Sequence, residues 1–307
     1  MEQILHSPEI TKVFLDWAIK KPFVAFVLEP NHATPKFYSF KTLGSLIDSA
    51  KSLAVLKSQN SVIFAEFGMP QGFLYRLIDS GFKVFLCDGQ LVSELRGELK
   101  KTDKLDAQLL YRLYQKNPEA FREVSELETQ ELKFSVLMSK YAHLTMDWVR
   151  FGHRQKAYER EFGEKVYKEI IKKLDSERRK VLKEVEPLIE DELQKLKNIK
   201  GLGLKLVAGM LSVAHPKNFQ SLSRYLAYCG YKDSVGNKYS RKAKTTAYLI
   251  ARSFIMNKNP EFYQLYLKIK QDLKAKFPKD SKTRINNKAI NRLTTFALKR
   301  IYRTIKP

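Results

Sequence analysis

Two aspartates lie three residues apart in a strongly basic chain. Asp103 and Asp106 occur in "KTDKLDAQLL", after Lys100 and Lys101. On a helix, residues three apart share a face, so two such carboxylates repel each other by about 0.2–0.5 kcal/mol. A divalent cation between them removes that cost, and Mg²⁺ binds readily through one or two carboxylates together with substrate phosphates. The spacing therefore predicts a metal site that acts on phosphate.

Two further acids lie inside apolar segments. Asp16 is in "KVFLDWA" and Glu66 is in "SVIFAEFG". A carboxylate on a buried strand is costly unless it is paired or bound to a metal, although each acid alone also fits a satisfied core residue. With Asp103 and Asp106 they make a candidate two-metal site for phosphoryl transfer, with Mg²⁺ or Mn²⁺ ions about 4 Å apart. Asp88, in "FLCDG", is either a rival ligand or a turn residue.

The acids are carried by a first part, residues 1–120, in which strands and helices alternate. Runs rich in Val and Phe predict strands, and a segment that opens with Pro70 and ends at Gly81 has the pattern of a helix. The predicted strands are 12–18, 22–30, 36–40, 61–68 and 82–89, and the predicted helices are 42–56 and 70–81. This order predicts a mixed sheet flanked by helices.

The second part, residues 121–198, has almost no strand signal. Residues 169–199 have apolar side chains at helical spacing and are interrupted at Pro187, which predicts an amphipathic, coiled-coil-like helix. Upstream, Gly152 and Gly163 are expected to mark bends or helix ends. We interpret this part as a helical spacer or dimerisation arm.

The third part, residues 199–307, is predicted to be mainly helical. It opens with Gly201 and Gly203 in "IKGLGLKL", a turn similar to a helix-hairpin-helix. Backbone N–H groups at such a turn can accept a phosphate, but the turn also fits a plain link between helices. A loop rich in Ser, Lys and Gly then separates two helices, and basic amphipathic helices end the chain.

The charge of the chain favours a nucleic-acid partner. The 307 residues contain 56 Lys and Arg against 33 Asp and Glu, a formal net charge of +23. From Arg241 onward there are 18 Lys and Arg and 3 Asp and Glu, a net charge of +15. So basic a chain usually meets nucleic acid. The candidate binding residues are Lys100, Lys101, Gly201, Gly203, Lys232, Lys238, Arg241, Lys242 and Lys244.

Composition also narrows the class of protein. Only two cysteines occur, Cys87 and Cys229, so a disulfide framework is excluded. No run of about 18 uncharged apolar residues predicts a membrane span, and the N-terminus has no signal-peptide pattern. We expect a cytoplasmic, nucleoid-associated protein that does not bind membranes.

The chain resembles the insertion-sequence transposases with a DEDD motif, the group called IS-one-ten, which includes the Piv-type invertases and the bridge-RNA-guided recombinases. "KTDKLDA" is similar to the family's Lys-Thr/Ser-Asp-x-x-Asp-Ala block, and an acid on the first strand and Glu on the fourth complete its pattern. Residues 199–234 resemble the start of the family's second conserved domain. The resemblance implies a RuvC/RNase H-like catalytic domain, a coiled-coil-like arm and a C-terminal transposase domain.

The resemblance also implies a serine nucleophile in the third part. Ser234, in "GYKDSVGNK", is the best match, and Ser240 is the alternative. The implied partners are DNA, as element ends and target, and a structured non-coding guide RNA. Since recombination of two duplexes needs at least two active sites, the resemblance implies a homodimer or tetramer.

Two other functions fit the residues. A nuclease that resolves Holliday junctions would use the four acids to activate water and would need no serine. A non-catalytic nucleic-acid-binding protein from a decayed element would use the basic surface alone, but it gives no reason for four spaced acids.

Overall fold

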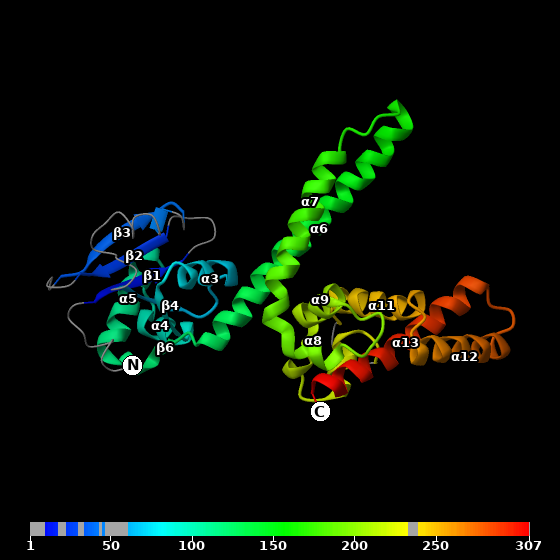
Figure 1. Ribbon diagram of the computed structural model, residues 1–307. Helices are drawn as coiled ribbons and strands as arrows, with labels where there is room; N and C mark the ends of the chain where they lie inside the picture. Colours follow the sequence, from blue (N-terminus) through cyan, green and yellow to red (C-terminus); the bar gives the residue numbers. More distant parts are fainter. Residues whose placement is uncertain are drawn as a thin grey trace. The chain divides into compact units, whose positions relative to one another are not determined.

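The computed structural model describes residues 10–17, 23–29, 34–42, 45–46, 61–232 and 239–306. The chain forms two compact units, Met1–Val136 and Leu137–Pro307. Over the described residues, the first unit contains a sheet with helices and the second contains helices and turns (Figure 1). Every helix within these ranges is too short or too polar to span a bilayer.

Six strands form one mixed sheet in the first unit. Their order is β3-β2-β1-β4-β5-β6, in which β1 is parallel to β4, β4 is parallel to β5, and the other neighbours are antiparallel. The strands are β1 (Thr11–Asp16), β2 (Phe23–Leu28), β3 (Lys36–Phe40), β4 (Ser61–Glu66), β5 (Lys83–Cys87) and β6 (Arg122–Glu123). The five predicted strands are confirmed. The sequence did not reveal β6, because two residues carry no periodic pattern.

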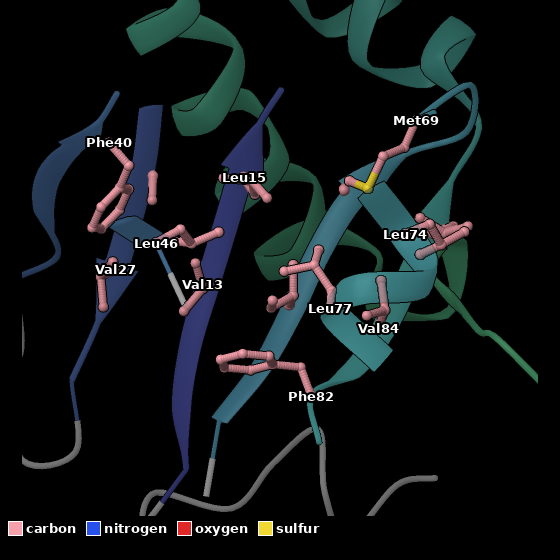
Figure 2. Close-up of a cluster of buried hydrophobic side chains, with 14 residues drawn as sticks. Val13, Leu15, Val27, Phe40, Leu46, Met69, Leu74, Leu77, Phe82 and Val84 are labelled. Atoms are coloured by element: carbon pink, nitrogen blue, oxygen red, sulfur yellow. The ribbon is translucent and has the colours of Figure 1, made fainter. Parts of the chain in front are cut away.

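The central strands are apolar along their whole length because both faces of the sheet are covered. On one face, Val13, Leu15 and Val84 pack with Leu74 and Leu77 (Figure 2). The last two belong to α3 (Gln71–Asp79), which confirms the helix predicted between Pro70 and Gly81. Of the helix predicted at 42–56, the structure describes only residues 45–46, which are helical.

The opposite face carries a row of three phenylalanines. Phe14 on β1, Phe64 on β4 and Phe85 on β5 stack in turn, with ring centroids 5.0 and 5.3 Å apart. Two helices, α4 (Gly89–Arg96) and α5 (Asp103–Lys116), cover this row with their apolar faces. This face of the sheet is the one on which the acids lie.

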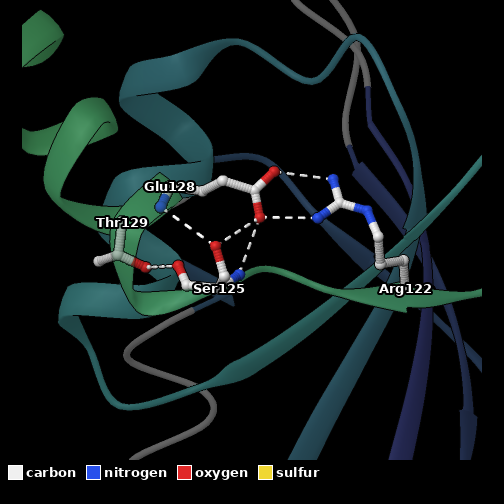
Figure 3. A network of polar contacts seen from close by, with 4 residues as sticks. All are labelled: Arg122, Ser125, Glu128 and Thr129. Carbon is white, nitrogen blue, oxygen red and sulfur yellow. Dashed lines mark hydrogen bonds and ion pairs between the residues drawn. The ribbon is translucent and has the colours of Figure 1, made fainter.

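A polar network fixes the start of α6 (Glu126–Phe162) next to β6 (Figure 3). Ser125 and Glu128 form a capping box, since the Glu128 carboxylate accepts a hydrogen bond from Ser125 N at 2.9 Å and the Ser125 hydroxyl accepts one from Glu128 N at 3.2 Å. Arg122 donates two bonds of 2.7 Å to the same carboxylate. These bonds, first that from Arg122, lower the pKa of Glu128 to about 2.

In the second unit, α6 and α7 (Lys168–Val185) lie side by side (Figure 1). Arg178 of α7 joins them, because its guanidinium lies 4.7 Å from the ring centroid of Trp148 and 5.4 Å from that of Tyr141 on α6. Its Nε also donates to Thr145 Oγ1 at 3.1 Å. The buried Arg178 guanidinium therefore interacts with aromatic faces and a hydroxyl group instead of with water.

Of the two glycines predicted to mark bends or helix ends, one lies at the end of a helix and the other does not. Gly163 follows the last residue of α6 with a φ of 71°, a conformation that glycine adopts without strain. Gly152 lies inside α6 and does not end it. A glycine costs a helix interior only about 1 kcal/mol relative to alanine, which the packing of a 37-residue helix outweighs. Pro187 lies in a 3₁₀ turn directly after α7, as predicted.

Four of the remaining helices, α8, α10, α11 and α12, contact α13 (Lys282–Ile305), while α9 packs on α11. The buried side chains of α13 recur every three or four residues, so one apolar stripe faces these neighbours and basic residues occupy the other side. The other five helices are α8 (Glu190–Leu196), α9 (Leu204–Ala214), α10 (Leu222–Tyr228), α11 (Arg241–Met256) and α12 (Pro260–Lys276). The predicted basic amphipathic helices at the end of the chain are confirmed as α12 and α13.

A buried hydroxyl in this unit gives a stability prediction. The Tyr225 side chain is fully buried, its hydroxyl has no hydrogen-bond partner within the described structure, and its ring packs on Phe219 and Tyr302. Since an unsatisfied buried polar group costs about 1–3 kcal/mol, Tyr225→Phe should leave the free energy of unfolding unchanged or raise it. Tyr302→Phe is the control: it loses a 3.3 Å bond to Phe219 O and should cost about 1 kcal/mol. Urea denaturation measures both, and a loss above about 1 kcal/mol in Tyr225→Phe contradicts the prediction.

Candidate functional site

Asp16 and Glu66 end two adjacent parallel strands at the same edge of the sheet. Asp16 is the last residue of β1 and Glu66 is the last residue of β4. The register pairs Phe14 with Phe64, so two residues further along Asp16 is level with Glu66. Because side chains alternate along a strand, both acids lie on the phenylalanine face, which α5 covers.

Asp103 and Asp106 occupy the first turn of α5. The Thr102 hydroxyl caps this helix by accepting a hydrogen bond from Leu105 N at 3.2 Å. The exposed N–H groups of a helix N-terminus favour negative charge, which offsets the repulsion between the two carboxylates. A basic chain can therefore hold two acids on one turn without a large loss of helix stability.

Electrostatic coupling shows that the four predicted acids lie close together. The pKa of Asp16 is raised to about 7, first by burial and then by the charges of Asp106, Asp103 and Glu66. The pKa of Glu66 is also raised, first by burial and then by Asp106. Lys101 opposes both shifts. The acids from two strands and one helix therefore form a single cluster, which is called the acidic site below.

Arg96 is the residue of this site that the sequence did not reveal. Asp106 is 1% exposed, and its Oδ1 accepts a 2.8 Å hydrogen bond from Nε of Arg96 and lies 2.8 Å from Nη2 of the same guanidinium in an ion pair. Arg96 is the last residue of α4, four positions after the buried Val92, so both side chains lie on one helix face. The i, i+4 spacing of Val92 and Arg96 was the sequence signal that could have pointed to Arg96. It becomes informative only once the end of α4 and its packing against α5 are known.

Gly89 leaves the space that Glu66 occupies. A Cβ atom built on Gly89 would lie 3.1 Å from Glu66 Oε2, so a larger residue would push the carboxylate away. The neighbouring Asp88, the rival ligand, caps α4 by accepting a hydrogen bond from Gln90 N at 2.9 Å. Of the two roles predicted for Asp88, metal ligand or turn residue, the structure supports the turn residue.

The donor chemistry of the acidic site fits a hard divalent cation, because all four side chains offer carboxylate oxygens. Asp106 Oδ2 is buried and has no hydrogen-bond partner in the described structure; Lys101 Nζ lies 3.7 Å away. A buried carboxylate oxygen without a partner is costly, and a metal ion would satisfy it. In the conformation of the described ranges, the His, Cys, Asp and Glu side chains form no group of three or more that could hold a metal ion.

The predicted nucleophile Ser234 and the predicted contact Lys238 lie outside the described residues. Ser240, the alternative serine, is described and caps α11: its hydroxyl accepts a hydrogen bond from Ala243 N at 3.2 Å. Its own N–H donates to Tyr228 O at 2.8 Å. Ser240 therefore has a structural role at the start of a helix.

Three predicted phosphate contacts of the second unit, Arg241, Lys242 and Lys244, lie in the first two turns of α11. Arg241 and Lys242 are exposed in its first turn, and Lys244 Nζ lies 4.5 Å from the ring centroid of Tyr239. Lys232 donates a 2.6 Å bond to Ser223 Oγ. In the first unit, Lys100 and Lys101 are exposed between α4 and α5.

The glycine turn is packed against its own unit. Gly201 has a φ of 92°, and a Cβ atom there would lie 3.2 Å from Ser253 O on α11. The Ser253 hydroxyl donates a 2.6 Å bond to Gly201 O, while Gly203 precedes α9 as its capping residue. These contacts show why a glycine occupies position 201, where two helices are tightly connected. Gly203 is exposed at the N-terminus of α9.

Comparison with known proteins gives no relative: no protein-family model matches the chain, and no curated protein matches it either. The function of this protein is therefore inferred from its own residues. Two features matter most, the acidic site on the first unit and the excess of cations after Arg241.

The raised pKa of Asp16 predicts a loss of stability as pH rises. Between the ordinary value of 3.8 and about 7, only the folded state keeps the proton, so the free energy of unfolding falls through this window and stays low above it. Asp16→Asn removes the effect. At pH 8 in EDTA we expect the variant to be more stable by about 1 kcal/mol, a rise in melting temperature of about 2–4 °C.

The control is Asp79→Asn, an equal change of charge at an exposed position of α3 on the other face of the sheet. It should melt like the wild type. Equal or lower stability of Asp16→Asn at pH 8 would show that the Asp16 charge is not under strain.

Proposed function

We propose that this protein is a DNA transposase or site-specific recombinase that cuts and rejoins strands with a metal-dependent acidic site. The observation that carries the proposal is the convergence of Asp16, Glu66, Asp103 and Asp106 on one face of the sheet. Four buried or half-buried acids held so near one another are costly to a fold, and the pKa values of Asp16 and Glu66 are raised by burial and by the neighbouring carboxylates. In a chain of net charge +23, a role in phosphate chemistry gives a reason to keep them.

The side chains divide the work at this site. Mg²⁺ or Mn²⁺, when bound, would stabilise charge on the attacking and leaving oxygens of a phosphodiester. Asp16 and Glu66 are held by the rigid strand ends, Asp103 and Asp106 by the capped turn of α5, and Gly89 keeps the position of Glu66 open. Lys100 and Lys101, exposed beside the acids, are placed to attract the DNA backbone to them.

The second unit supplies the basic surface in this proposal. In the described part of the segment after Arg241, the cations that form ion pairs are Arg284 and Lys288, and both pair with Asp280. The unpaired cations repel one another and the positive end of α11. A polyanion relieves that repulsion, and the element's DNA and a structured non-coding RNA are the polyanions we propose.

Ser234 completes the proposed chemistry. In the sequence it lies between Lys232 and Lys238, whose ammonium groups would stabilise a phosphate as the hydroxyl attacks. Its hydroxyl bonds to phosphorus, its proton leaves to a base, and the 3′ oxygen of the cut strand departs. The assignment rests on resemblance and on this placement in the sequence. A homodimer or tetramer would supply the two or more active sites that two duplexes require.

The acidic site is tested with Asp103→Asn, which keeps the size of the side chain but removes one charged donor. Loss of metal-dependent charge stabilisation should reduce strand cleavage by about 100-fold or more, since several kcal/mol are at stake. The assay combines the full chain with Mg²⁺, DNA carrying the element's ends and target, and RNA transcribed from beside the gene. Filter binding should show nucleic-acid affinity unchanged.

Asp79→Asn is again the matched control and should cleave like the wild type, because Asp79 lies on α3 outside the acidic site. If Asp103→Asn retains wild-type cleavage, the acids do not hold a catalytic metal and the proposal is withdrawn.

The serine is tested by trapping a covalent protein–DNA adduct. The wild type should form one, and Ser234→Ala should abolish both the adduct and recombination while DNA binding persists. Ser240→Ala is the comparison: it removes the cap of α11, which costs about 1 kcal/mol, but should keep the adduct. An adduct lost only in Ser240→Ala would move the nucleophile to Ser240. Cleavage without any adduct would favour the alternative, a junction-resolving nuclease that uses water.

A further inference from the structure

Asp106 is held by a fixed cation on one of its two oxygens. Arg96 Nε donates a 2.8 Å hydrogen bond to Oδ1, Nη2 forms an ion pair with the same oxygen at 2.8 Å, and the Arg96 side chain is only 13% exposed. Both contacts of the rigid guanidinium fork end on one oxygen and therefore anchor Oδ1. The ordinary bidentate arrangement, one donor to each oxygen, would have occupied Oδ2 as well.

The consequence is that Asp106 has one oxygen left for another ligand. Oδ2 is buried and makes no hydrogen bond within the described structure. The second cation at this side chain, Lys101, lies 3.7 Å from Oδ2, but its side chain is 67% exposed and can turn into solvent. Asp106 can therefore offer a metal one oxygen but cannot bridge two metals with both.

The sum of charges at the acidic site also favours one divalent cation over two. The groups that act on one another are four carboxylates together with Arg96 and Lys101, so the net charge is −2 when all the acids are ionised. One divalent cation brings this sum to zero. A second would leave a net charge of +2 in a partly buried place, which is unfavourable without a further anion.

We propose that Arg96 is a positioning residue that limits the acidic site to one divalent cation while no nucleic acid is bound. Arg96 takes the place of a second cation at Asp106 by occupying Oδ1, so Oδ2 is the oxygen that would be left to hold the first. The inference rests on the proposed function, because it concerns the same acidic site. It adds a regulatory consequence: the site receives a second ion only together with an anion, and the phosphate of the substrate is that anion.

The alternative is that Arg96 only stabilises the fold. A buried ion pair that loses one partner leaves an uncompensated charge, so any change at Arg96 affects stability. The number of bound ions separates the two roles, because a purely structural arginine has no effect on how many cations the acids take.

The experiment counts Mn²⁺ bound to the full chain at pH 8 without nucleic acid. Titration calorimetry gives the stoichiometry, and electron paramagnetic resonance distinguishes one isolated Mn²⁺ from two coupled neighbours. Binding to other surface acids is subtracted with the double variant Asp16→Asn, Asp103→Asn. We expect one isolated ion in the wild type and two coupled ions in Arg96→Gln, whose site loses a positive charge and frees Oδ1.

Two further variants sharpen the result. Arg76→Gln makes the same change at an exposed position of α3 and should bind one ion like the wild type. Arg96→Lys keeps the charge but loses the fork, so it should bind one ion about 10-fold more weakly, the usual effect of losing a residue that orients a metal ligand. If Arg96→Gln does not fold, Arg96→Lys decides, and wild-type affinity in it overturns the inference.

The outcomes separate this inference from the proposed function. Two ions in the wild type, or a single ion in folded Arg96→Gln, overturn the role of Arg96 and leave the catalytic proposal standing. No specific Mn²⁺ in the wild type overturns the proposed metal site itself, and the inference with it.

Discussion

The pairing register between β1 and β4 is the constraint on which the acidic site depends. Phe14 lies beside Phe64 in that register. Asp16 and Glu66, two residues further along the same strands, therefore also lie side by side on the same face of the sheet. A slip of one residue would turn Asp16 toward the opposite face, against the cluster that contains α3. The stacked phenylalanines resist such a slip, because the rings of Phe14 and Phe64 also pack against Tyr114 of α5. Apolar packing therefore fixes the positions of the charges.

Several features limit the cost of placing charges there. The N-terminus of α5 favours Asp103 and Asp106, Arg96 neutralises Asp106, and a glycine at position 89 avoids displacing Glu66. None of them removes the strain entirely, since the pKa of Asp16 remains raised to about 7. A site that stays unfavourable in the absence of a cation is poised to bind one, because binding releases the repulsion already present in the fold.

The sequence was sufficient for the parts of this arrangement that depend on local patterns. Continuous apolar runs predicted the strands that carry Asp16 and Glu66, and the spacing of Asp103 and Asp106 predicted a shared helix face. Arg96 was missed because its role depends on where α4 ends and which helix it meets, which is tertiary information. Gly152 was misjudged for a related reason: glycine weakens a helix locally, but packing along the whole of α6 decides whether the helix continues.

The two units of the chain concentrate charges of opposite sign, and under the proposed function a bound partner would balance what the fold leaves uncompensated in each. In the first unit, like-charged carboxylates are held together by strand register and helix capping. In the second, Arg241 and Lys242 crowd the N-terminus of α11, where the helix dipole disfavours positive charge. Swapping a few of these residues for neutral ones would be expected to stabilise each unit. The chain nevertheless keeps a cluster of carboxylates suited to a divalent cation and a group of cations suited to a polyanion. A protein that acts on nucleic acid through a metal would require both.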